Sequence, residues 1–401
     1  MGTQAVTGEA PVSPTLDLGE LARRLASPAP SATCSWRPWI VRLRPGEADR
    51  LRAVCREHRV AVIDTIDRQL GELAAVRWPS RSNDAERRRF IDELLSGHGG
   101  SESYGNWIYL PWEEKIVHLL ERDDYYEVIT NRNLDKITRE EMVSLRGKRI
   151  GVIGLSVGGE AAVTVAQEHL CGAMALADFD RLDLSNLNRL DAGFDELGEK
   201  KSTIVARRIV KIDPYLELTV FEDGVTPTNL AAFLDGLDLV IDECDDLQMK
   251  RELRLRAKER GLNLVFAADE RGFLSVEPYA YQPDLPPFHG RIEGPQLGRD
   301  AFPTPLAFMK ALTEWMGGWD NISQRSRRSL ERIGDTLCGY PQLASEARYA
   351  AGQIGNVVRR LLLGERVEPF LGNLDLTDLV PSTAPSDQRT AHSGGSKVSG
   401  S

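Results

Sequence analysis

The sequence has few cysteines, and they lie far apart. Its 401 residues contain five, with no Cys-x-x-Cys pair and no histidine at metal-ligand spacing: Cys34, Cys55, Cys171, Cys244 and Cys338. Paired cysteines mark structural zinc sites and the disulfide frameworks of secreted proteins. We therefore expect no zinc and no disulfides, and we interpret each cysteine as a small buried hydrophobic residue.

Long apolar runs and an excess of positive charge are also missing. No stretch approaches the run of about eighteen apolar residues that a membrane helix needs, and the N-terminus lacks the basic and apolar parts of a signal peptide. The formal net charge of −10 argues against nucleic acid as a partner, because nucleic-acid-binding proteins usually present a basic face. We expect a cytoplasmic protein that binds no membrane.

The composition, 41% hydrophobic and 27% charged, is that of a globular protein with a buried core. Residues 1–34 are rich in Pro, Ala, Ser and Thr and predict a flexible leader with one amphipathic piece at 16–25. Residues 35–125 predict an α+β extension with strands near 39–43 and 60–63 and helices at 47–58, 85–95 and 112–126. Residues 371–401 predict a flexible C-terminal tail.

Residues 126–370 alternate between strand and helix patterns from position 149 onward. We expect strands at 149–153, 174–178, 216–221, 238–242 and 262–267, an antiparallel strand at 275–281, and helices at 158–170, 201–212, 226–235, 247–260, 304–316, 322–336 and 344–363. Short connections between strands and helices favour a parallel sheet. The predicted fold class is α/β, with a Rossmann-like, doubly wound, mostly parallel sheet.

A glycine-rich turn follows the first strand of this alternation. It contains Gly154, Ser156, Gly158 and Gly159 and leads directly into an Ala/Val-rich helix. Backbone without Cβ atoms can approach a polyphosphate closely, and the helix N-terminus favours an anion. The same letters also spell Gly-x-Ser-x-Gly, which presents the nucleophilic serine of α/β hydrolases. The turn alone leaves both chemistries open.

Charged and amide side chains follow the later strands. Asp178 lies 19 residues beyond Gly159, where an acid commonly meets the ribose hydroxyls of a nucleotide. The polar loop after it and the start of the next helix add cations beside the phosphate turn, and strand 238–242 leads into an acidic cluster. The carboxyl ends of parallel strands share one edge, so all of these should face one crevice: Asp178, Asp180, Asn186, Arg189, Lys201 and Asp245.

These motifs resemble the ThiF/MoeB/HesA family of adenylyltransferases, which is related to the ubiquitin-activating enzymes. The resemblance covers roughly residues 125–370 and is most specific at Asp178-Phe-Asp180 and at Ser185-Asn-Leu-Asn-Arg189. It is closest to a branch in which some members are fused to a nitroreductase-like domain. The paired zinc cysteines found in many members are absent, and residues 279–303 contain no cysteine to form a thioester.

The resemblance implies ATP-dependent adenylation of a carboxylate, with Mg²⁺ and without a cysteine thioester on the crossing loop. It places Arg189 and Lys201 on the phosphates, Asn186 in orienting them, and Asp245 on the metal ion. Gly154, Ser156, Gly158, Gly159, Asp178 and Asp180 would bind the nucleotide. It also implies a homodimer in which Arg132 reaches the partner's ATP. The acceptor would be a carrier protein, a peptide or a small carboxylic acid.

Three alternatives remain open from the sequence. One is a nucleotide-binding scaffold that has lost turnover, and another is an NAD-binding protein that uses the same turn. The third is a serine hydrolase, with Ser156 followed in chain order by Asp245 or Asp269 and then His289. His289 could instead line an acceptor channel, although a loop histidine is more often structural.

Overall fold

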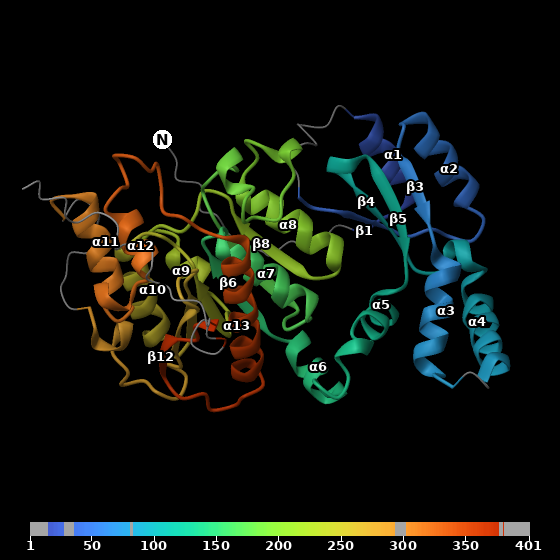
Figure 1. Ribbon diagram of the computed structural model, residues 1–401. Coiled ribbons are helices and arrows are strands. Elements are labelled where there is room, and N and C mark those ends of the chain that lie inside the picture. Colours follow the sequence, from blue (N-terminus) through green and yellow to red (C-terminus); the bar gives the residue numbers. More distant parts are fainter. Residues whose placement is uncertain (1–14, 28–35, 81–82, 293–301, 377–379, 381–401) are drawn as a thin grey trace, which may run out of the picture.

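The computed structural model describes residues 15–27, 36–80, 83–292, 302–376 and 380. They form two bodies, each built on its own sheet, which lie side by side in Figure 1. The smaller body is drawn in blue and teal, and the larger body runs from green to red. Among the described residues, no helix combines the length and the apolar character that a membrane crossing requires.

The smaller body is a five-stranded mixed sheet with helices around it. Its strand order is β1 (Thr15–Leu16), β2 (Trp39–Val41), β4 (Asn106–Leu110), β5 (Lys115–Leu119) and β3 (Ala61–Asp64). The helices are α1 (Leu18–Ala26), α2 (Ala48–Glu57), α3 (Ile66–Arg77) and α4 (Asp84–His98). The aromatic residues Tyr104, Trp107 and Tyr109 are buried in this body.

Part of the segment predicted as a flexible leader is folded. Strand β1 pairs in parallel with β2, and helix α1 follows it directly. Leu16, Leu18 and Leu21 are buried in the core of the smaller body. The composition of residues 1–34 concealed this contribution, because the apolar positions of the short helix are surrounded by small polar residues.

The helix predicted at 112–126 is wrong. The structure has a β-hairpin there, in which β5 pairs antiparallel with β4, and a helix, α5 (Arg122–Ile129), begins only afterwards. The buried residues Ile116 and His118 alternate along β5 with half-buried ones, which is the period of a strand with one face in the core.

The larger body confirms the predicted α/β class. Its seven strands are ordered β12 (Phe370–Asn373), β11 (Phe273–Glu277), β10 (Asn263–Ala267), β9 (Leu239–Asp242), β6 (Arg149–Ile153), β7 (Ala173–Ala177) and β8 (Glu217–Phe221). The five strands from β10 to β8 are parallel, and β11 and β12 are antiparallel. Strand β12 extends the folded body three residues past the predicted start of the tail at 371.

Helices cover both faces of this sheet. The core on one face is shared by α7 (Val157–Gln167), α8 (Lys201–Ile212) and α13 (Ala344–Leu362). The core on the other face is shared by α9 (Leu230–Phe233) and α10 (Leu247–Glu259). Three further helices complete the body: α6 (Arg139–Arg146), α11 (Pro305–Glu314) and α12 (Gln324–Leu330). Strands that are buried on both faces are apolar along their whole length, which is why the sequence predicted them well.

The chain reverses its direction across the sheet at β6. From β6 it proceeds to β7 and β8 on one side, and it then returns to β9 and β10 on the other side. Such a switch point opens a crevice at the carboxyl ends of the strands, where doubly wound proteins bind their ligands. The glycine-rich turn lies at this point.

Candidate active site

The glycine-rich turn is shaped by a close approach to the end of β9. Gly154 has a φ of +81°, and a Cβ there would lie 2.3 Å from the backbone oxygen of Glu243. A Cβ on Gly158 would meet the Glu243 side chain at 3.0 Å, and one on Gly159 would meet Val205 of α8 at 2.9 Å. The glycines therefore let β6, β9 and the two helices pack closely.

The N-terminus of α7 has no side-chain cap. Ser156 is its N-cap residue but makes no capping hydrogen bond, and Ser156 and Val157 both line a cavity. At the start of this eleven-residue helix, the N–H of Gly159 donates to the Ser156 carbonyl at 3.1 Å, which leaves the N–H groups of Val157 and Gly158 for a ligand at that wall. Helix N-termini of this kind bind phosphate and carboxylate groups.

The acids after β7 hold the turn and a lysine in place. The Asp178 carboxylate accepts hydrogen bonds from the backbone N–H of Leu155 at 2.6 Å and of Asp180 at 2.7 Å. Burial raises the pKa of Asp178, while these two donors favour its charged form. Lys201, at the start of α8, places Nζ 2.8 Å from Asp180 and 3.4 Å from the Ser156 hydroxyl. The predicted residues of turn, strand end and helix start therefore meet.

Arg189 lines the same cavity, and one of its donor atoms has no hydrogen-bond partner among the described residues. Its Nη1 donates to the Ser185 carbonyl at 3.2 Å and to the Asn188 side chain at 2.9 Å. Its Nε is buried and has no partner among the described residues. Burial lowers the pKa of this guanidinium, while Asp269 and Asp245 favour the charged form. An arginine normally stays protonated, so a cation with one buried, unpartnered donor lies in the wall of the cavity.

Asn186 is buried and stabilises the loop at residues 183–189, which contains Arg189. Its side-chain oxygen accepts from the backbone N–H of Asp183 at 3.0 Å, which caps the short helical turn Leu184–Asn186. Asn186 also lines the cavity. The structure thus gives it a positioning contact to the loop that presents Arg189.

The acidic cluster after β9 divides, instead of facing the crevice as one group. Asp242 is fully buried in ion pairs, and Asp246 caps α10 by accepting from Met249 N at 2.6 Å. Glu243 accepts from Ala267 N at 2.9 Å, and burial raises its pKa well above the ordinary value. Asp245 is exposed and lines the cavity. Of the carboxylates on this strand end, Glu243 and Asp245 line the cavity, and of these two only Asp245 is exposed.

The cavity joining these residues has a volume of about 850 Å³. Ser156, Asp180, Asn186, Arg189, Lys201 and Asp245 all line it. Further polar residues that the sequence did not single out for nucleotide binding also line it, among them Glu243, Lys250 and Asp269. Burial raises the pKa of Asp269, which accepts from the Gln342 side chain at 2.7 Å.

Lys250 is the most informative of the residues that the sequence reasoning missed. It is 2% exposed, and its Nζ lies 3.3 Å from Asp242 and 4.0 Å from the ring centre of Phe266. The available signal was its position eight residues after Asp242 on the charged helix α10. A lysine and an acid on neighbouring elements pair only when the fold brings them together.

Two predicted residues lie elsewhere. Arg132 is exposed in the short helical turn Asn131–Asn133 and is not part of the cavity wall. His289 has its Nε2 3.2 Å from the Ser275 hydroxyl of β11, and it does not line the cavity either. The hydrolase alternative needs His289 beside Ser156, and the hypothesis of an acceptor channel needs it in the cavity wall. Neither arrangement is found.

The structure also shows the surroundings of the cysteines and of possible metal ligands. No group of three or more His, Cys, Asp or Glu side chains that could hold a metal ion occurs among the described residues. Cys244 donates to Asp242 at 3.0 Å, and burial raises the pKa of its thiol well above the ordinary value. Cys55 and Cys171 are buried, Cys338 is exposed at the cavity, and Cys34 lies outside the described residues.

Comparison with known proteins finds a family model and relatives that are similar to parts of this chain. Residues 130–276 match the model of the ThiF family. An uncharacterized protein of Mycobacterium tuberculosis is 34% identical over 375 residues, which is 87% of this chain and 50% of that protein. The tRNA threonylcarbamoyladenosine dehydratase of Escherichia coli is 35% identical over 136 residues, which is 33% of this chain and 50% of that enzyme.

This chain spans about half the length of the curated relatives it matches. Among solved structures, that of the Escherichia coli tRNA N6-threonylcarbamoyladenosine dehydratase is 20% identical. It covers 60% of this chain and 96% of its own, with a TM-score of 0.42.

Proposed function

We propose, from the match of residues 130–276 to the ThiF family model, that this protein activates a carboxylic acid by transferring AMP to it from ATP. The observation that supports this best is the convergence of cationic donors on one cavity. Lys201 and the uncapped start of α7 form one wall, and Arg189 faces the cavity with its Nε unpartnered among the described residues. A polyphosphate satisfies these donors, whereas hydride transfer from a dinucleotide needs no such clamp.

The reaction joins two anions, so its barrier is largely electrostatic. A carboxylate oxygen of the substrate forms a bond to the α-phosphorus of ATP, and the bond from that phosphorus to the bridging oxygen breaks. The products are an acyl-adenylate and pyrophosphate, which keeps the bonding electron pair. Arg189 and Lys201 would neutralise the charge that develops on the phosphates, and preorganised donors of this kind are the largest single contribution in many enzymes.

The site fits Mg²⁺ as a companion of the phosphates. Asp245 is an exposed carboxylate on the cavity wall, and magnesium is usually held by one or two carboxylates together with phosphate oxygens. The ion would withdraw charge from the leaving pyrophosphate. Gly154, Ser156, Gly158, Gly159, Asp178 and Asp180 would hold the nucleotide through the turn and the strand end.

We further propose a homodimer in which Arg132 acts on the partner's ATP. The side chain is exposed and lies outside the cavity of its own chain, as such a role requires. No thioester on residues 279–303 belongs to the proposal, because that segment contains no cysteine. Sedimentation that shows a monomer at micromolar concentration would contradict the role of Arg132.

ATP–pyrophosphate exchange tests the assignment directly. Arg189→Ala, Lys201→Ala and Asp245→Ala should each lower the exchange rate by a factor on the order of 10² to 10³, by analogy with other preorganised charges. Lys200→Ala is the matched control, because Lys200 pairs with Asp223 at 2.9 Å and does not line the cavity. Exchange that is unchanged in the three cavity variants would refute the assignment.

A nucleotide-binding protein without turnover remains the second candidate, since a site of this charge binds ATP whether or not it reacts. Isothermal titration with ATP and with NAD, followed by an assay of pyrophosphate release, separates the two. ATP binding without pyrophosphate release from any carboxylate favours the scaffold. Preference for NAD would favour a dinucleotide site.

A further inference from the structure

The candidate active-site cavity has two unlike halves. One half contains the donors and acids described above. The other half is mainly apolar and includes Phe266, Met309, Leu312, Met316, Ile322 and Leu330, with the polar residues Glu270, Thr313 and Tyr340 beside them. These side chains come from the end of β10, from α11, from the turn after it and from α12. A triphosphate is charged along its whole length, so it gains no binding free energy from apolar surface.

The side chains of the apolar half are held in place by a buried hydrophobic cluster. Met316, Ile322 and Leu330 are each at most 8% exposed, and they belong to one hydrophobic cluster with the fully buried Trp315. The Trp315 ring packs against Phe266 at 4.8 Å and against Phe288 at 5.4 Å. Met309 and Leu312 are half-buried and lie one turn apart on α11, so they present their surfaces to the cavity from a fixed helix.

The volume of the cavity also favours a second occupant. At about 850 Å³ it lies near the upper end of the range for ligand pockets, roughly 300 to 1,000 Å³. A ligand that covers apolar surface of the wall gains binding free energy, roughly 25 cal/mol for each Å² of that surface that it removes from water. The region next to Arg189 is where a carboxylate would have to enter.

We propose that the carboxylic acid activated here carries an apolar acyl chain, which lies against Met309, Leu312 and Met316 while its carboxylate meets Arg189. This inference rests on the proposed adenylation and adds the class of substrate to it. A glycine-terminated peptide would leave the wall uncovered at the reacting end. The adenine ring is the other candidate occupant, and the test distinguishes it.

Stable mimics of the acyl-adenylate provide the test. Isothermal titration of the full chain compares 5′-O-(N-acetylsulfamoyl)adenosine with its N-hexanoyl homologue, which differs by four methylenes. If the chain lies on the apolar wall, each buried methylene should tighten binding about fourfold, from about 0.8 kcal/mol apiece. We therefore expect the hexanoyl mimic to bind on the order of 10²-fold more tightly.

Substitutions on α11 test whether the difference in affinity between the two mimics arises at the apolar wall. Leu312→Asp should remove the difference between the two mimics, and Leu312→Ala should reduce it if the aspartate variant fails to fold. Glu314→Ala is the control on the same helix, because Glu314 is exposed and does not line the cavity, and it should keep the difference.

The outcomes separate the inference from the proposed function. Equal affinities for the two mimics, with tight ATP binding, would overturn the apolar acyl subsite and leave adenylation standing. Weaker binding of ATP itself in Leu312→Ala would place adenine on the wall and overturn the inference too. If neither mimic nor ATP binds, the proposed function itself fails. If ATP binds and neither mimic does, both adenylation and the subsite are contradicted.

Discussion

Arg254 stands between two buried acids at the base of the active-site region. Its Nη1 lies 2.5 Å from Asp242 and its Nε 2.7 Å from Glu277, and all three side chains are fully buried. Burial alone would raise the pKa of Asp242, but Lys250 and Arg254 lower it below the ordinary value. A buried pair of this kind adds little net stability when complete, but it is costly to break.

Arg254→Met should therefore lower the free energy of unfolding by about 3 to 5 kcal/mol, because it leaves Asp242 and Glu277 without their shared cation. Urea denaturation measures the loss. Arg256→Ala, two residues along the same helix, removes an exposed ion pair with Glu259 and should change stability little. Equal losses of stability in the two variants would show that the buried acids do not need Arg254 to remain stable in the folded protein.

Glu243 makes stability depend on pH with a definite sign. Its pKa is raised in the folded protein, mainly by burial, so the folded state binds a proton more tightly than the unfolded state does. Stability from this group is complete below the ordinary pKa of 4.5 and falls as the pH rises toward the raised value.

Glu243→Gln removes that pH dependence while its amide oxygen can still accept from Ala267 N. The variant should gain stability relative to the wild type as the pH rises from about 4.5 toward neutrality. Urea titrations at several pH values provide the curve, and a constant difference between the two proteins across this range would contradict the buried-acid interpretation.

At the scale of single elements, α13 offers two glycines in different surroundings. A Cβ on Gly352 would meet nothing within 4 Å, whereas a Cβ on Gly355 would lie 3.1 Å from Thr164 of α7. Both sit in the interior of a 19-residue helix, so alanine should improve helix propensity equally at each. The difference between them measures how tightly α13 packs on α7.

Gly352→Ala should stabilise the protein by about 0.5 to 1 kcal/mol, from the lower backbone entropy of alanine in the unfolded chain. Gly355→Ala should gain clearly less or lose stability, because Thr164 must move. Thermal unfolding of both variants beside the wild type makes the comparison. Equal gains would mean that the two helices are not in close contact at Gly355.

How well the sequence predicted an element depended on where its side chains lie. Strands β6, β7, β9 and β10 are buried on both faces, so their apolar runs identified them to within one residue or so. Strand β5 was mistaken for a helix because only one of its faces is buried, and a short alternating run fits either period. The site residues followed from strand ends, whereas Lys250 and the apolar half required the tertiary fold.

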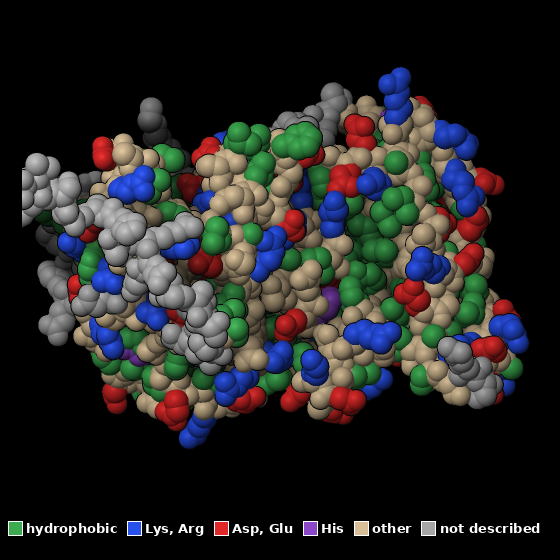
Figure 2. Space-filling model, viewed as in Figure 1, with side chains coloured by type: hydrophobic (Ala, Val, Ile, Leu, Met, Phe, Trp, Pro, Cys, Tyr) green, Lys and Arg blue, Asp and Glu red, His purple; other side chains and the backbone are tan. Residues whose placement is uncertain are grey.

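At the scale of the whole molecule, helix α8 links the site to the smaller body. Its first residue, Lys201, lines the cavity, and residues near its other end contact the smaller body. Lys211 Nζ lies 2.6 Å from Glu113, and the Tyr125 hydroxyl donates to the Ile212 carbonyl at 2.5 Å. Figure 1 shows α8 between the two sheets, and Figure 2 shows hydrophobic side chains gathered near β4 and β5 on that side.

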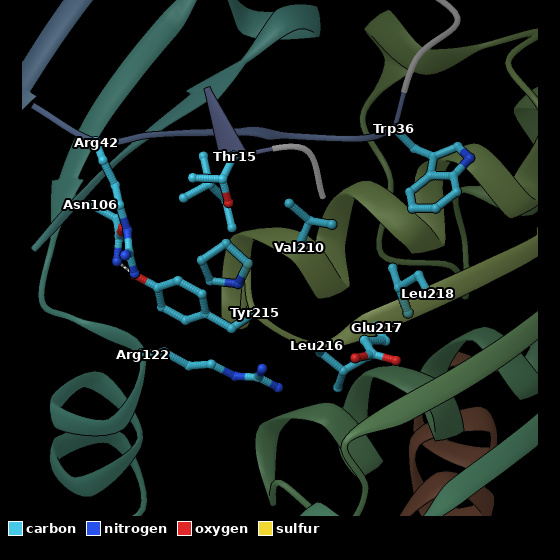
Figure 3. Close-up of a pocket in the computed structure, with 12 residues that line it drawn as sticks. Thr15, Trp36, Arg42, Asn106, Arg122, Val210, Tyr215, Leu216, Glu217 and Leu218 are labelled. Carbon is cyan, nitrogen blue, oxygen red and sulfur yellow. Dashed lines mark hydrogen bonds between the residues drawn. The ribbon is translucent and has the colours of Figure 1, made fainter. Parts of the chain in front are cut away.

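Beside these contacts the two bodies enclose a hollow of about 180 Å³, shown in Figure 3. Asn106 and Arg42 of the smaller body approach Tyr215 of the larger body there. The Tyr215 hydroxyl donates to the Leu120 carbonyl at 2.7 Å and accepts from Asn106 Nδ2 at 3.0 Å. Asn106 Nδ2 also donates to Glu121 at 3.3 Å, whereas the buried Leu120 carbonyl accepts the Tyr215 hydroxyl, and water cannot easily replace that donor.

Tyr215→Phe removes the two hydrogen bonds that the Tyr215 hydroxyl makes to the smaller body, and it keeps the ring in place. Leaving buried polar groups unpaired should cost about 1 to 3 kcal/mol, and the cost falls on the interface. Of the seven tryptophans, Trp39, Trp78 and Trp107 lie within the smaller body, and Trp36 and Trp112 pack against the core of the larger one. Tryptophan fluorescence therefore reports mainly on the smaller body and its contact with the larger one, whereas far-ultraviolet circular dichroism reports on both. In urea the fluorescence midpoint of the variant should fall below its dichroism midpoint, because the smaller body loses the support of the larger one. Tyr349→Phe, which removes a hydrogen bond to Leu374 within the larger body, should leave the fluorescence midpoint unchanged. Coincident midpoints in Tyr215→Phe would mean that the other contacts along α8 suffice to make the two bodies unfold as one.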